Sequence, residues 1–137
     1  MNNFSTGRCF TWNDLNRAVA AAIQNPDLPP GKAPVTAGAD PSHGMAVTSD
    51  GKTLVVDSRI NNALYAYSLP DLKLLGGADL GGKGAAWVTL TPDGKTAYVA
   101  NAVTNDVSVV DIKSLKEVAR IPVGFVPKRN TTGMLQE

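Results

Sequence analysis

The chain has 137 residues, 43% of them hydrophobic and 18% charged, which predicts one folded domain rather than a disordered chain. Thirteen Lys and Arg against twelve Asp and Glu leave a formal net charge of +1, so overall charge gives no reason to expect nucleic acid or an anionic membrane as a partner. One cysteine, Cys9, excludes an internal disulfide, and one histidine, His43, excludes a metal site made of several histidines from one chain.

Residues 1–34 are predicted to form an N-terminal segment of their own. The segment shows no long apolar stretch like that of a secretory signal peptide, and its apolar run at residues 18–23 is too short to span a bilayer. Thr11 is placed to cap a helix over residues 11–24, whose apolar side chains recur at helical spacing. The four prolines at positions 26–34 predict a stiff, extended connector after this helix.

From residue 35 onward, an internal repeat of 43 residues organises the chain. The stretch Ser-Asp-Gly-Lys-Thr at residues 49–53 recurs as Pro-Asp-Gly-Lys-Thr at residues 92–96, and the same offset pairs Asn62 with Asn105. The register holds over a whole unit without a gap, which indicates a true structural repeat.

Each unit has the pattern of four short strands with a turn signal at every join. The Asp-Gly pairs that begin at Asp50 and Asp93 predict hairpins between the first and second strands. Strands are predicted at residues 44–48, 53–57, 63–67 and 73–80, and again at 87–91, 96–101, 106–111 and 116–123. Four antiparallel strands in a period in the low forties are typical of a β-propeller blade. The predicted fold class is therefore all-β, a β-propeller fragment of two four-stranded antiparallel blades. The blades are expected at about residues 44–86 and 87–130, within a domain of residues 35–130, and a tail of residues 131–137 follows.

The second unit carries motifs of a known family. Residues 92–101, Pro-Asp-Gly-Lys-Thr-Ala-Tyr-Val-Ala-Asn, are similar to the blade motif of YVTN-type β-propellers, with Ala100 where that family usually has Thr. Residues 121–127 resemble its link between blades, and residues 54–58 resemble a degraded copy of its strand motif. The resemblance covers about residues 35–130. Because YncE-like and cytochrome d1-like propellers are among the proteins of this type, it implies a periplasmic or extracellular protein but no single function.

Two blades cannot close a ring, because propellers contain about four to eight blades. The sheet edges and apolar faces of two blades are expected to be covered by other polypeptide. We therefore expect either a protein partner or self-association of several copies to complete the propeller, and no nucleic acid or inserted membrane segment.

Polar and charged side chains gather at one predicted end of the blades, where the loops between second and third strands meet the connections between blades. The binding candidates at this end are His43, Asp57, Arg59, Asn62, Lys83, Asn101, Asn105, Lys128 and Arg129. The cations among them favour a small anionic ligand, and the alternative is that they are solvated loop charges offset by nearby carboxylates.

No catalytic residue is predicted. Ser42 and His43 are adjacent, a spacing that rarely orients a nucleophile and its base, and no G-x-S-x-G motif is present. His43 is the one candidate metal ligand, without the Cys-x-x-Cys-His motif that attaches heme, so neither a metal nor a cofactor is predicted. The leading hypothesis is a non-catalytic binding or interaction scaffold. The alternative is a redox or other enzyme subunit whose cofactor lies in the channel of the assembled propeller.

Overall fold

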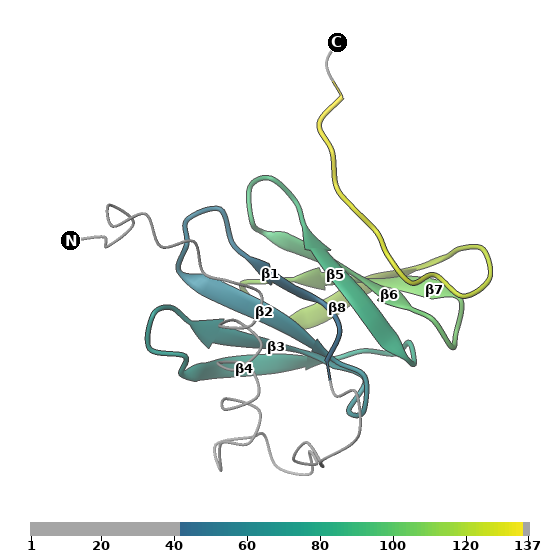
Figure 1. Ribbon diagram of the computed structural model, residues 1–137, viewed down its shortest axis with the longest axis horizontal. Helices are drawn as coiled ribbons and strands as arrows, with labels where there is room; N and C mark the ends of the chain where they lie inside the picture. The colour runs from purple at the N-terminus through teal and green to yellow at the C-terminus, as the bar shows by residue number, and fades with distance from the viewer. Residues whose placement is uncertain (1–41, 136–137) are drawn as a thin grey trace.

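The computed structural model describes residues 42–135, so the predicted N-terminal helix and proline-rich connector lie outside the described residues. The strands are β1 (Met45–Val47), β2 (Thr53–Ser58), β3 (Ala63–Ser68), β4 (Leu74–Asp79), β5 (Ala85–Leu90), β6 (Thr96–Asn101), β7 (Asp106–Asp111) and β8 (Lys116–Pro122). They form two antiparallel sheets with sequential strand order, β1-β2-β3-β4 and β5-β6-β7-β8 (Figure 1). The predicted all-β class and the two four-stranded blades are confirmed.

The hairpin turns owe their shape to the repeated Thr-x-Asp-Gly-Lys stretch. Thr48 Oγ1 donates to Asp50 Oδ1 at 2.7 Å, and the same oxygen accepts the Lys52 N–H at 3.0 Å. The equivalent residues 43 positions later repeat the two bonds at 2.6 and 3.1 Å. The hydrogen bond from Thr48 is the largest influence that lowers the pKa of Asp50. These carboxylates are engaged in turn geometry, as the sequence predicted, and not in catalysis.

The main core lies between the two sheets, where β1 and β2 contact β5, and β4 contacts β8. Most of its side chains are small or β-branched, which lets the sheets approach closely. The buried members are Val55, Leu64, Ala66, Ala78, Leu80, Ala85, Val88, Ala97, Val99 and Val110. This packing fixes the second sheet against one face of the first.

A second apolar cluster lies on the opposite face of the first sheet. It is made of Leu54, Val56, Ala63, Tyr65 and Tyr67. Both tyrosines are only 1% exposed, so they serve as packing residues. The central strands β2 and β3 of the first sheet are therefore buried on both faces.

Candidate functional site

A depression of about 190 Å³ lies at the end of the sheets where the predicted binding residues gather. Its lining comes from the chain before β1, the turn after β2, the start of β5, the end of β6 and the segment after β8. The lining residues are His43, Arg59, Ala86, Trp87, Ala102, Lys128 and Arg129. The structure thus brings together four predicted site residues: His43, Arg59, Lys128 and Arg129.

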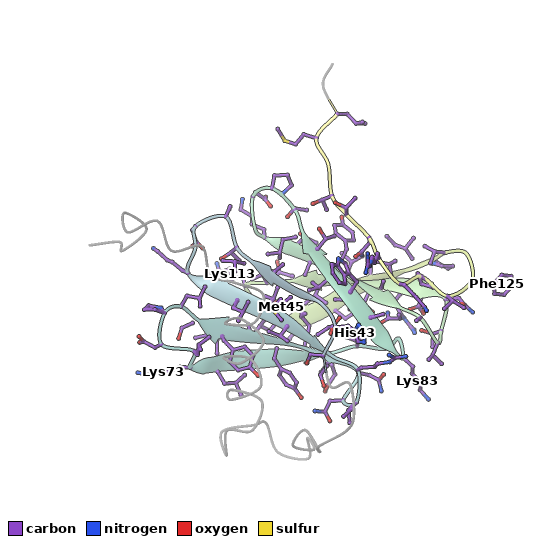
Figure 2. All side chains as sticks on the ribbon, in the orientation of Figure 1. His43, Met45, Lys73, Lys83, Lys113 and Phe125 are labelled. Atoms are coloured by element: carbon purple, nitrogen blue, oxygen red, sulfur yellow. The ribbon has the colours of Figure 1, made fainter. Side chains whose placement is uncertain are left out.

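Figure 2 shows which end of the molecule this is. His43 and Lys83 lie at one end of the sheets, whereas Lys73 and Lys113 lie at the other. Lys73 and Lys113 belong to turns that connect β3 with β4 and β7 with β8. The two ends therefore provide separate sets of cations, and the second set is a natural control for the first.

Trp87 and Arg129 form one wall of the depression. The Arg129 guanidinium carbon lies 5.3 Å from the centroid of the Trp87 ring, a cation–π contact worth about 0.5–1 kcal/mol at an exposed site. Trp87 follows an irregularity in the pairing of β5 with β6, where the register shifts between Ala85 and Trp87. Bulges of this kind redirect a side chain at the rim of a sheet. The contact holds Arg129 at the rim, with its charge at the depression.

The cations of the depression form no ion pair within the part of the chain that the structure describes, although the buried Asp57 carboxylate attracts Arg59. Arg59, Lys128 and Arg129 are exposed and form no ion pair with another residue of 42–135. No carboxylate lines the depression. The site therefore concentrates positive charge although the whole chain carries a net charge of only +1.

Asp57, another predicted site residue, is 0% exposed. Its Oδ1 accepts the backbone N–H of His43 at 2.9 Å, and its Oδ2 has no hydrogen-bond partner among the described residues. Burial raises the pKa of Asp57, and the backbone N–H bonds from His43 and Gly44 oppose that rise. Asp57 therefore acts on the site indirectly, by fixing the chain that carries His43.

Asn101 has a similar supporting role. It is 0% exposed, and its Nδ2 donates to Asp106 Oδ1 at 2.8 Å and to Ser108 Oγ at 2.7 Å. Asp106 also lies 3.5 Å from Arg120. These bonds join β6, β7 and β8 into a polar network within the second sheet, so Asn101 does not line the depression.

Asn62 lies in the turn between β2 and β3, and Asn105 lies in the turn between β6 and β7; each side chain holds the segment that leaves its sheet. Their φ angles, 46° and 59°, are left-handed, which asparagine tolerates better than most residues. Asn62 Oδ1 accepts the Gly84 N–H at 2.9 Å, and Asn105 Oδ1 accepts the Val126 N–H at 2.8 Å. Both amides are thus engaged with the backbone, and neither residue lines the depression.

Lys83 is exposed and does not line the depression either. Its backbone N–H donates to Thr104 Oγ1 at 3.0 Å and its carbonyl accepts the Val103 N–H at 3.0 Å. Trp87 is not among the site residues predicted from the sequence, and its contact with Arg129 was not predicted. Residues 42–135 contain no group of three His, Cys, Asp or Glu side chains that could hold a metal ion. The same residues include no helix long and apolar enough to cross a membrane.

No family model and no curated protein matches the chain. Among solved structures, it is similar to hydrazine synthase of Kuenenia stuttgartiensis, with 26% identity and a TM-score of 0.62 over 72% of this chain and 28% of that one. It is also similar to the dihydro-heme d1 dehydrogenase NirN, with 24% identity and a TM-score of 0.54 over 60% of this chain and 18% of that one. The β-propeller domain of Cps50 (Swd1) from Myceliophteria thermophila gives 12% identity and a TM-score of 0.53 over 60% of this chain and 26% of that one.

These similarities agree with the sheet topology, and the described chain is two blades of a β-propeller. It spans less than a third of the length of each of the three structures. Their names include a synthase, a dehydrogenase and a propeller domain, so the fold alone does not choose between an enzyme and a scaffold. Membership of the YVTN family and a periplasmic or extracellular location stay predictions.

Proposed function

We propose that this blade pair is a binding module for a small anion, a carboxylate or phosphate compound, held at the depression beside Trp87. The observation that carries the proposal is the convergence of Arg59, Lys128 and Arg129 on one depression without a carboxylate in its lining. Guanidinium groups bind carboxylate and phosphate oxygens in pairs, which gives both affinity and orientation.

The size of the depression limits the ligand. About 190 Å³ is below the roughly 300–1,000 Å³ of pockets that enclose drug-sized molecules. A small anion fits this space, whereas a tetrapyrrole does not. The arginines reach the ligand from two different segments, the turn after β2 and the link after β8, so binding would tie the two blades together.

Isothermal titration calorimetry of the full chain with inorganic phosphate and with succinate tests the proposal. Arg59→Gln and Arg129→Gln should each weaken binding by about tenfold or more, since a hydrogen bond to a charged group is worth about 1.5–3 kcal/mol. Affinity should also fall as sodium chloride is raised, because the site is open to solvent.

Lys73→Gln is the matched control, because it removes one exposed cation from the opposite end of the sheets (Figure 2). It should leave the dissociation constant unchanged. If neither anion binds, or if Lys73→Gln weakens binding as much as Arg129→Gln does, the depression is not the anion site and the proposal fails.

A further inference from the structure

The outer face of the second sheet, which points away from the first sheet, is apolar and only partly covered. Cross-strand pairs place Thr89 beside Tyr98, Tyr98 beside Val109, and Val107 beside Ile121. A hollow of about 460 Å³ runs over this face, and Ile121 is 46% exposed. We call this surface, made of Thr89, Tyr98, Val107, Val109 and Ile121, the outer face.

The repeat shows what such a face does in the other blade. The residues 43 positions earlier are Ala46, Val55, Leu64, Ala66 and Ala78. All five belong to the core between the sheets or pack against it, and Leu64 and Val55 are 0% exposed. The same face of the repeated unit is therefore an interface in the first blade, where the second sheet covers it, and is open in the second blade.

The chain after β8 already follows the path that leads to a further blade. Residues 131–134 occupy the repeat positions of residues 88–91, which include the second half of β5. Asn130 Nδ2 donates to the Tyr98 carbonyl at 3.1 Å, and Thr132 Oγ1 donates to the Leu90 carbonyl at 2.6 Å. In Figure 1 this segment, in yellow, leaves β8 and runs past β5 beside the outer face. It makes no strand pairing within the described residues, so the outer face is bordered by this segment and not covered by a sheet.

We propose that the outer face is a docking site for a further four-stranded antiparallel sheet that presents small and β-branched side chains. The existing junction defines this chemistry, because the second sheet meets the first with Val88, Ala97, Val99 and Val110. The partner sheet comes from other polypeptide and not from a second copy of this chain. The face that a second copy would have to offer carries Leu54, Val56, Tyr65 and Tyr67, each 0–1% exposed.

Trp87 adds a requirement on the partner. It occupies the repeat position of Gly44, where an added Cβ would collide with the backbone of Trp87 and Val88. A sheet that docks as closely as the second sheet docks on the first must therefore leave space for the indole.

A chain in which residues 131–137 are replaced by another copy of residues 88–130 supplies such a sheet in register. It is made with Trp87 and, as a second variant, with Trp87→Gly, which restores the residue type of the first junction. Val107→Asp is then introduced into the parent and the extended chains, and the midpoint temperature of unfolding is measured. A docked sheet buries the new carboxylate, so its cost should be more than about 10 °C in an extended chain and less than about 5 °C in the parent.

Val118→Asp is the matched control. Val118 is 62% exposed, and its repeat equivalent Leu75 stays 56% exposed although the second sheet covers that blade. Its cost should therefore be the same in all chains. Equal costs of Val107→Asp in the parent and in both extended chains would overturn the proposal. A parent chain that forms a discrete oligomer by light scattering, and loses it with Val107→Asp, would show a second copy as the occupant and overturn it too. Neither readout depends on anion binding.

Discussion

Replacement of Asn62 by glycine and by alanine separates the two contributions of this residue to the link between blades. Asn62→Gly removes the amide that accepts the Gly84 N–H at 2.9 Å but tolerates the φ of 46°. Gly84 is buried, so its N–H loses its partner at a cost of about 1–3 kcal/mol of unfolding free energy. Asn62→Ala loses the same bond but keeps a Cβ at this left-handed φ without the amide that makes the conformation tolerable for asparagine, so it should cost about 1–2 kcal/mol more than Asn62→Gly.

The same change at Asn105 is the internal control. Its amide accepts the Val126 N–H at 2.8 Å, but Val126 is 52% exposed, so water can replace the lost acceptor. Asn105→Gly should cost no more than about 1 kcal/mol. Urea unfolding followed by circular dichroism gives each free energy, with an unchanged m-value as the check on two-state behaviour. Equal costs of the glycine substitutions at Asn62 and Asn105, or equal costs of Asn62→Gly and Asn62→Ala, would refute the assignment of these roles.

Three further predictions concern buried groups. Burial raises the pKa of Asp57, so its contribution to stability is present below its ordinary pKa of 3.8 and is lost as pH rises through the pKa of the folded state. Asp57→Asn should therefore have a higher unfolding free energy than the parent at pH 7. A difference in unfolding free energy that stays constant from pH 7 to pH 3 would contradict this. Burial, with a smaller repulsion from Tyr65, raises the pKa of Tyr67 to about 12. In urea titrations the unfolding free energy of the parent should therefore fall between pH 10 and 12, and more steeply than that of Tyr67→Phe. Equal losses of unfolding free energy in the two proteins would show that Tyr67 is not the cause. Leu64→Ala should lower the unfolding free energy by about 2–5 kcal/mol in the same assay, because Leu64 is 0% exposed between the sheets; a loss below 1 kcal/mol would mean that this core is not packed as described.

The strands were predictable because the repeat supplies the same turn chemistry twice. The predicted strands at residues 96–101 and 106–111 match β6 and β7 in full. The main difference is β5, which was predicted to begin at residue 87 and begins at Ala85. A register shift between Ala85 and Trp87 places an extra residue in this strand, and a bulge leaves no signal in a pattern of alternating side chains.

The site was predictable only in part, because an asparagine in a loop has the same appearance in the sequence whether it binds a ligand or the backbone. Asn62 and Asn105 share one repeat position, and both carry a left-handed φ and the same backbone bond. Their recurrence at equivalent positions was the available signal of a structural role. Lys128 and Arg129, in contrast, have Ala85 and Ala86 as their equivalents in the preceding unit.

That contrast gives a physical reason to place function at the depression. The hairpin end repeats its Thr–Asp bonds in both blades, which shows a shared constraint of folding. At the depression the repeated positions diverge: one is occupied by His43, Ala86 and Arg129, and another by Arg59 and Ala102. The alanines leave the space, and the arginines supply the charge. The divergence at these positions therefore creates both the space and the positive charge on which the proposed anion site depends.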